Sequence, residues 1–229
     1  MSTVDRPGAR STPALAAGQR LDRATFHQRY QAMPPGVRAE LVGGVVFMPS
    51  PLGYRHGNVD SELSDWLGFY KRRTRGVEKA LNVTTQFGDY GEVQPDLILR
   101  IPEELGGASK IVGGFIVGPP ELVVEVSLST RSHDLGPKKA DYQRAGVREY
   151  LFVGLDPEEV RWFVLREGVY RELEAGEGGE LRSEAFPGLW LNPGALLSGD
   201  ADALIATLER GLASPEHEAF VRRLHARTD

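Results

Sequence analysis

Two acidic residues stand inside apolar stretches of the sequence. Glu125 lies in the middle of 121-ELVVEVSLST-130, and Asp96 opens the apolar run in 93-VQPDLILR-100. Such runs predict strands that are buried on both faces of a sheet. A charged group in that setting is costly unless another group pairs with it or binds it.

The two carboxylates could lie side by side, because strands that follow each other in the sequence often pair. Carboxylates in close contact repel each other, so that one becomes protonated or a cation lies between them. Their oxygens suit hard cations, and Mg²⁺ above all where the protein supplies few ligands. The alternative is that each carboxylate forms a buried ion pair with an arginine or lysine, or points outward from an edge strand.

A lysine follows on the next predicted helix, which runs between Pro137 and Gly146. Lys138 lies in its first turn, and Tyr142 shares its face four residues later. If this helix packs back across the preceding strand, Lys138 reaches the carboxylates. A cation there could steady an attacking water or the charge that develops on phosphorus. The alternative for Lys138 is a solvated helix end, although positive charge at a helix N-terminus opposes the helix dipole.

This pattern of a PD dipeptide at 95–96, Glu125 and a lysine on the following helix resembles the PD-(D/E)xK nuclease superfamily. More closely, the chain resembles the putative restriction endonuclease family, formerly a domain of unknown function. The likeness runs from about Leu21 to Leu191. It rests on three stretches in order: 40-ELVGGVVFMPSP-51 with His56 after it, 94-QPDLIL-99, and 122-LVVEVSLSTRSHDLGPKKADYQRAGVREYLFV-153.

The resemblance implies an α/β (α+β) chain with a restriction-endonuclease-like fold, in which helices flank a central mixed sheet. It also implies a Mg²⁺-dependent endonuclease that hydrolyses DNA, with Mn²⁺ as a substitute ion. By position, Asp96 and Glu125 would be the metal ligands and Lys138 the displaced lysine of such a site. We expect the backbone carbonyl of Val126 to be a further metal ligand.

Other residues would complete the site by the same resemblance. Glu40 takes the place of the acidic residue that often comes from the N-terminal part, although a surface carboxylate on a hairpin is an equal alternative. Gln94, Tyr142 and His56 would support the ligands, and a lone histidine such as His56 is more often structural. The loop 127-SLSTRSHD-134 departs from the family pattern, because the usual proline is missing and the serines are shifted. A catalytically silent binding or assembly module with a nuclease fold is therefore the alternative function.

The elements that would position these residues can be read from periodicity and turn signals. Helices are expected over 21–32, 56–72, 137–146 and 201–212, and again in the charged C-terminus. Strands are expected in a hairpin over 38–48, over 81–87, 93–101 and 121–130, and in a meander over 150–173, with a short apolar run at 115–117. We predict a disordered tail over 1–20, one nuclease-like domain over 21–195, and a C-terminal helical extension over 196–229.

The composition and the absence of several motifs exclude other classes of enzyme. The chain has 229 residues, a net charge of −5 and no cysteine, which excludes disulfides and thiol nucleophiles and fits a reducing cytoplasm. The serine-hydrolase elbow, the HExxH zinc motif, the Walker loop and the dinucleotide fingerprint are all absent. No segment has the length of a membrane span.

Because the total charge is acidic, contact with DNA requires local positive charge. One basic group follows the helix over 56–72 (Lys71, Arg72, Arg73, Arg75), and another surrounds the predicted site (Arg131, Lys138, Lys139, Arg144, Arg148). The alternative for the first group is a favourable contact with the helix dipole. A homodimer would bring two sites to a duplex, one for each strand.

Overall fold

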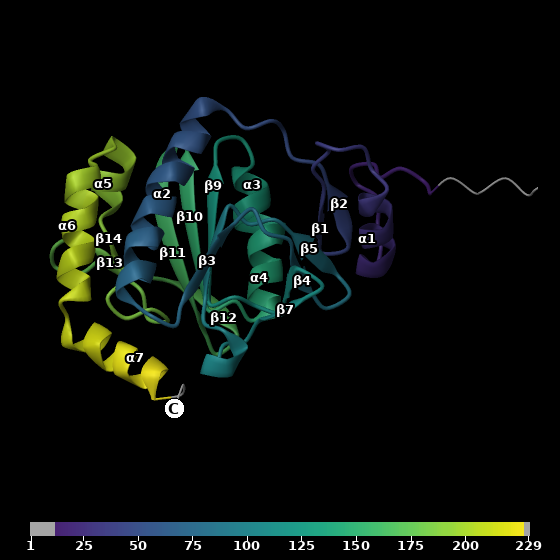
Figure 1. The fold of residues 1–229 in the computed structure, drawn as a ribbon. Coiled ribbons are helices and arrows are strands. Elements are labelled where there is room, and N and C mark those ends of the chain that lie inside the picture. Colours follow the sequence, from purple (N-terminus) through teal and green to yellow (C-terminus); the bar gives the residue numbers. More distant parts are fainter. Residues whose placement is uncertain (1–11, 227–229) are drawn as a thin grey trace, which may run out of the picture.

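The predicted apolar strands form the centre of a mixed sheet. In the computed structural model, which describes residues 12–226, β9 (Leu122–Ser127) runs parallel to β10 (Glu149–Leu155) and antiparallel to β6 (Leu97–Arg100) (Figure 1). The other strands of this sheet are β3 (Glu78–Leu81), beyond β6, and β11 (Glu158–Arg166) and β12 (Val169–Glu172), beyond β10. The expected pairing of the strands that carry Asp96 and Glu125 is confirmed.

A second mixed sheet is built from shorter strands. Its order is β2 (Val45–Phe47), β1 (Glu40–Val42), β5 (Gly91–Val93), β4 (Thr85–Phe87), β8 (Phe115–Val117) and β7 (Lys110–Val112). The hairpin predicted over 38–48 is β1 and β2, which turn at Gly43 and Gly44, both with positive φ. This hairpin brings Glu40 to the junction between the sheets.

The strands predicted over 81–87 and 93–101 are each divided, so the prediction of continuous strands is wrong there. Asn82 takes a left-handed φ of 48°, and its N–H approaches the carbonyls of Pro95 and Asp96 at 3.1 Å. At Asn82 the chain leaves the large sheet for the small one, and it returns at Gln94–Asp96. Pro95 has no N–H for a strand ladder, which favours a break at this point.

Helices cover both faces of the large sheet, and strand alternation decides which face Glu125 occupies. Val124 belongs to the core that α2 (Tyr54–Arg73) covers, whereas Val123 packs in the core that contains Tyr142 of α4 (Lys139–Ala145). These helices lie on opposite sides of β9 and β10 (Figure 1). Glu125 shares the parity of Val123 and therefore faces α4.

The connection from β9 to β10 differs from the single helix expected from Pro137. It consists of α3 (Arg131–His133), a π-helical turn η2 (Asp134–Lys138) and α4. Gly136, with φ −103° and ψ −107°, interrupts the helical backbone and sets Lys138 at the start of α4. The predicted end of the helix at Gly146 is confirmed, because that residue has φ 86° and closes the last turn.

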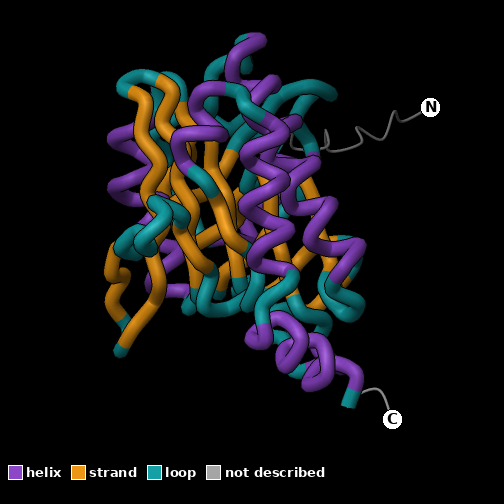
Figure 2. The backbone as a smooth tube through the Cα atoms, turned by 90° about the vertical axis from the view of Figure 1, so that its left-hand side faces the viewer, coloured by secondary structure: helices purple, strands orange, loops and turns teal. Residues whose placement is uncertain are grey.

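The terminal segments pack more closely than a tail and an extension would. Residues 1–11 of the predicted disordered tail lie outside the described residues, but Leu15 is buried and the Gly18 N–H donates to Val46 O (2.8 Å), just before α1 (Arg23–Gln31). At the other end, α6 (Ala201–Leu212) packs on α2, and its buried leucines belong to the main core. Figure 2 shows α7 (Pro215–His225) beyond one end of the strands. The remaining elements are η1 (Glu103–Leu105), β13 (Leu181–Arg182), β14 (Trp190–Leu191) and α5 (Pro193–Ser198).

No helix in the described part of the chain combines the length and the hydropathy needed to cross a membrane.

Glu149 at the start of β10 anchors the segment that leads to β14. One carboxylate oxygen accepts hydrogen bonds from the N–H groups of Glu184 (2.6 Å) and Ala185 (2.8 Å), and the other from Ser183 Oγ (2.7 Å) and the Trp162 indole (3.1 Å). The side chain is fully buried. Burial raises the pKa of Glu149 to about 7, although the four donors oppose the shift.

Glu149→Gln is expected to destabilise the fold by about 2–4 kcal/mol at pH 8, because the amide nitrogen would face two of the four donors. The raised pKa adds a signature: unfolding releases a proton between the ordinary pKa of 4.5 and about 7. The pH-dependent part of the contribution of Glu149 to stability is therefore present below pH 4.5 and is lost as the pH rises to 7, at roughly 1.4 kcal/mol per pH unit. The part that depends on its four hydrogen bonds remains at pH 8.

Urea denaturation across pH 5 to 8 checks both effects. The variant should lack the Glu149 part of the pH slope. Glu184→Gln, at an exposed carboxylate nearby, should change stability by less than about 0.5 kcal/mol. A Glu149→Gln protein as stable as the wild type at every pH would refute the anchoring role.

Candidate functional site

All but one of the predicted site residues meet at one cavity, and they come from four separate elements and the loop between β5 and β6. This cavity, of about 100 Å³, lies where the C-terminal end of β9 meets the N-terminus of α2 and the start of α4. Among the residues that line it are all but one of those predicted: Glu40, His56, Gln94, Asp96, Glu125, Val126 and Lys138. Tyr142 is the exception and lies directly behind Glu125.

Lys138 bridges two buried carboxylates. Its Nζ lies 2.9 Å from Glu125 Oε1 and 3.2 Å from Glu40, and all three side chains are at most 7% exposed. Burial opposes the charged form of the lysine, but Glu125 and Glu40 together hold the pKa of Lys138 above its usual value. The site therefore contains a lysine that is paired with two buried carboxylates, one of the alternatives that the sequence left open for a buried carboxylate.

Glu125 is held from two sides. Tyr142 donates its hydroxyl proton to Glu125 Oε1 at 2.5 Å, the same oxygen that Lys138 contacts. Burial raises the pKa of Glu125, and Lys138 partly offsets that shift. Burial and the neighbouring Glu125 also raise the pKa of Tyr142, which keeps the phenol protonated as a donor. The two donors fix one oxygen of Glu125 within the aliphatic strand.

Asp96 lies next to Glu125, immediately before the start of β6. The β6–β9 ladder ends at the pair Leu97 and Val124, so Asp96 and Glu125 are the next positions along the two chain segments. Asp96 Oδ2 accepts a hydrogen bond from the Val126 N–H at 2.8 Å. Burial raises the pKa of Asp96 to about 6, and Asp60 adds to this shift while Lys138 opposes it.

Glu40 and Gln94 are joined through the backbone. The Gln94 N–H donates to Glu40 Oε1 at 2.7 Å, whereas the Gln94 side-chain amide donates to the hydroxyl of Tyr30 at 2.9 Å. Glu40 is thus buried at the cavity and held by Lys138 and Gln94, so the alternative of an exposed hairpin carboxylate is wrong. The side chain of Gln94 ties the site to α1.

His56 contacts the predicted backbone ligand. Its Nε2 lies 2.8 Å from the carbonyl of Val126, and because a carbonyl only accepts, this nitrogen carries the proton. Nε2 is also 3.7 Å from Asp96 Oδ2, and Nδ1 is 3.1 Å from Asp60 Oδ2. His56, Asp60 and Asp96 form a group of candidate metal ligands whose atoms lie within 4.8 Å of one another.

Two acidic residues at the site were missed from the sequence. Asp60 stands one helical turn after His56, and this i, i+4 spacing was the available signal. Asp134 stands four residues before Lys138, which is the same helical spacing. It is buried at the cavity and accepts a hydrogen bond from Thr130 Oγ1 at 2.5 Å. Thr130 in turn contacts Ser127 Oγ at 3.1 Å. This chain of contacts holds the loop that departs from the family pattern.

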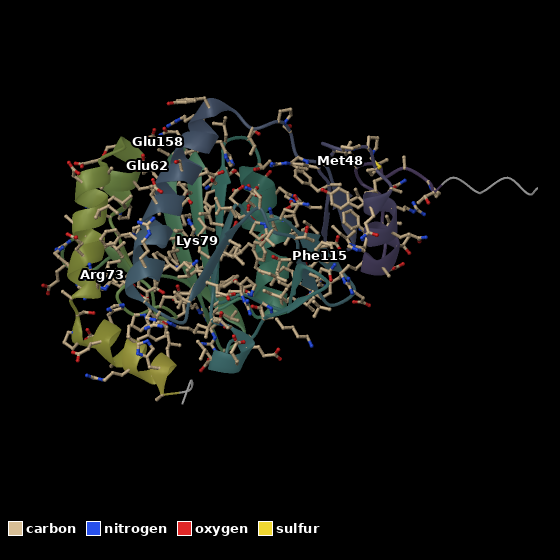
Figure 3. The ribbon with its side chains drawn as sticks, in the orientation of Figure 1. Met48, Glu62, Arg73, Lys79, Phe115 and Glu158 are labelled. Carbon is tan, nitrogen blue, oxygen red and sulfur yellow. The ribbon has the colours of Figure 1, made fainter. Side chains whose placement is uncertain are left out.

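The basic groups are distributed differently from the prediction. Arg73 lies at the opposite end of α2 from His56, roughly 25 Å away along the helix axis, and Figure 3 shows it near the lower end of that helix. Lys139 lies over the ring of Phe163. The basic group over 71–75 therefore stands away from the cavity, and Lys138 is the member of the second group that lines it.

Two arginines that are sequence neighbours of cavity-lining residues are engaged by glutamates. Arg55 pairs with Glu158 and donates to Leu155 O at 2.6 Å, and Arg131 pairs with Glu159. Glu158 appears near the upper end of α2 (Figure 3). Arg38 lines the cavity itself.

Comparisons with known proteins identify a family that the chain matches and a solved structure with a similar fold. Residues 24–194, more than half of the chain, match the family model Uma2, described as "Putative restriction endonuclease". A crystal structure of a putative nuclease belonging to DUF820 from Anabaena variabilis ATCC 29413 is similar, with a TM-score of 0.58 and 16% identity over 75% of this chain and 96% of that one. At that identity the likeness concerns the fold, and the predicted fold class is confirmed. No curated protein matches the chain.

Proposed function

The chain belongs to the Uma2 family of putative restriction endonucleases, and on that premise we propose that it is a divalent-metal-dependent endonuclease that hydrolyses the phosphodiester bonds of DNA. One observation supports the proposal above the others. Asp96, Glu125 and Glu40 reach one cavity from three separate elements, and the protonated Lys138 lies among them. This combination can hold a cation and stabilise negative charge at the same place.

The donor set fits a hard divalent ion such as Mg²⁺. Four carboxylates line the cavity (Glu40, Asp96, Glu125, Asp134) against the single lysine, and their oxygens are the ligands that this ion prefers. Asp96 and Glu125 would hold the ion, and Mn²⁺ could replace it. When bound, the ion would polarise a phosphate oxygen and lower the pKa of a coordinated water.

The protein's own side chains prepare that site before substrate arrives. Tyr142 and Lys138 fix Oε1 of Glu125, and the Val126 N–H fixes Oδ2 of Asp96, so one oxygen of each carboxylate is held in place. A charged group that is held before the reaction needs little reorganisation during it. Lys138 would position the attacking water or stabilise the charge that develops on the phosphate.

A substrate of nucleic acid would meet Arg38 at the cavity, and Arg55 and Arg131 stand next in sequence to the lining residues His56 and Thr130. Each contact with phosphate contributes through charge and weakens as salt concentration rises. One chain carries one such cavity among its described residues. A homodimer would therefore supply a second site for the other strand of a duplex.

The experiment is a substrate panel with purified protein. Supercoiled duplex, linear duplex and single-stranded DNA are incubated with Mg²⁺, with Mn²⁺ and with EDTA, at low and moderate salt. We expect cutting of at least one substrate that requires a divalent ion and stops with EDTA. Absence of cutting under every condition, by protein shown to be folded, would favour the catalytically silent binding or assembly module.

A further inference from the structure

Helix α2 presents a histidine and an aspartate to the side of Asp96 that faces away from α4. His56 and Asp60 are one turn apart, with His56 Nδ1 at 3.1 Å from Asp60 Oδ2 and His56 Nε2 at 3.7 Å from Asp96 Oδ2. His56 is 5% exposed and Asp96 is 8% exposed. The three residues can each offer one ligand atom within 4.8 Å of the others.

Two buried atoms in this group lack a hydrogen-bond partner. They are His56 Nδ1 and Asp60 Oδ1, although Nδ1 faces the other oxygen of the same carboxylate. Because Nε2 gives its proton to the Val126 carbonyl, the neutral imidazole carries a lone pair on Nδ1. A lone pair that faces a carboxylate oxygen at 3.1 Å is repulsive unless a proton or a metal ion lies between them.

The distance between His56 Nδ1 and Asp60 Oδ2 fits a metal ion between them. Two ligand atoms at right angles, each about 2.2 Å from an ion, are roughly 3.1 Å apart, which is the separation of His56 Nδ1 from Asp60 Oδ2. A histidine that binds a metal through one nitrogen commonly donates its other N–H to a backbone carbonyl. His56 makes that second contact with Val126.

We propose that His56, Asp60 and Asp96 form a second divalent-cation site, selective for an ion that accepts a nitrogen ligand, such as Mn²⁺ or Zn²⁺, over Mg²⁺. Imidazole suits these transition ions, whereas Mg²⁺ prefers oxygen ligands and retains its waters. The inference rests on the proposed function only in that Asp96 belongs to both sites. With Mn²⁺ the protein binds an ion on each side of Asp96, and with Mg²⁺ it binds one, between Asp96 and Glu125.

The test uses Mn²⁺ alone as the probe and follows it by electron paramagnetic resonance. Titration of the full-length wild-type protein should show more than one bound Mn²⁺, and pulsed measurements should show coupling of an ion to a histidine nitrogen. His56→Gln should abolish that coupling. Asp60→Asn, which keeps the imidazole, should weaken the nitrogen-coupled ion by about tenfold or more.

Two controls separate this site from the rest of the protein. Asp65→Asn changes an exposed carboxylate on the same helix and should leave the Mn²⁺ signals unchanged. Glu125→Gln should keep the nitrogen-coupled ion while it loses the other one. Circular dichroism establishes whether each variant is folded. If His56→Gln does not fold, Asp60→Asn provides the test of the site.

Wild-type protein that binds Mn²⁺ without nitrogen coupling would overturn the proposal, and His56 and Asp60 would then be a protonated ion pair. Coupling that persists unchanged in both His56→Gln and Asp60→Asn would overturn it as well. If the nitrogen-coupled ion is present but no DNA is cut, the second site stands and the proposed nuclease activity fails. If DNA is cut with Mg²⁺ but no nitrogen-coupled ion is found, the proposed nuclease activity stands and the second site fails.

Discussion

Asp96→Asn is expected to reduce metal-dependent DNA cleavage by about 10³-fold or more while the protein remains as stable as the wild type or becomes more stable. A metal ion contributes several kcal/mol to the charge stabilisation of the transition state, and each 1.4 kcal/mol corresponds to about tenfold in rate. Asparagine keeps the shape of aspartate and still offers one oxygen to the Val126 N–H, which donates to Asp96 at 2.8 Å. The variant therefore removes the charge and little else.

The stability result follows from the pKa of Asp96, which burial raises to about 6. A carboxyl group with a raised pKa is held in its charged form at a cost, so that its loss relieves the fold. Single-turnover cleavage and urea denaturation at pH 8 measure the two effects. Asp89→Asn, at an exposed position, is the matched control and should change neither. Cleavage by Asp96→Asn within a few-fold of the wild-type rate would show that this carboxylate holds no catalytic ion.

Lys138→Met is expected to lose activity and stability together. The lysine is the cation that contacts Glu125 at 2.9 Å and Glu40 at 3.2 Å, and both carboxylates are buried. Removal of one partner from a buried ion pair leaves an uncompensated charge and costs about 3–5 kcal/mol. Cleavage should fall by about 10²- to 10³-fold, because a positioned donor to the developing charge contributes about that much.

The Lys138→Met experiment has two useful comparisons. Lys139→Met alters the neighbouring lysine, which lies over Phe163, and should retain activity. Added Mg²⁺ or Mn²⁺ should restore part of the stability of Lys138→Met, because the ion supplies positive charge to the same carboxylates. A Lys138→Met protein with full cleavage activity would mean that the lysine is only structural.

The chemistry of the site was more predictable from the sequence than its surroundings were. Asp96 and Glu125 attract attention because carboxylates are rare inside apolar strands, and strands close together in the sequence often pair. In the structure β6 and β9 pair although β7 and β8 stand between them in the chain. Lys138 follows from the order of strand and helix. The role of each residue as ligand or catalyst stays a proposal, to be settled by the variants above.

Asp60 could not be assigned in the same way, because helical periodicity shows that His56 and Asp60 share a face but not which strand that face meets. The crossing of α2 over β9 and β6 decides this, and it depends on tertiary packing. The division of the strands at Asn82 has a similar cause. A single left-handed residue redirects the chain to the second sheet, and asparagine only modestly favours that conformation.

The packing of the terminal segments also could not be predicted from the sequence. The sequence around Leu15 is rich in small and polar residues, yet its leucine is buried beside the first hairpin. The C-terminal helices contribute Leu208 and Phe220 to the main core, so α2 is covered on the side that a shorter domain would have left open. Amphipathic periodicity predicted the helices but not the surface that they cover.

The most direct measurement is the position of Mn²⁺ in crystals of the wild-type protein, located by its anomalous scattering. It identifies the ion without reference to activity and therefore without interference from contaminating nucleases. We expect an ordered ion in contact with carboxylate oxygens of both Asp96 and Glu125. Ordered Mn²⁺ bound elsewhere, with neither Asp96 nor Glu125 in contact with an ion, would contradict a metal-dependent nuclease centre at this cavity.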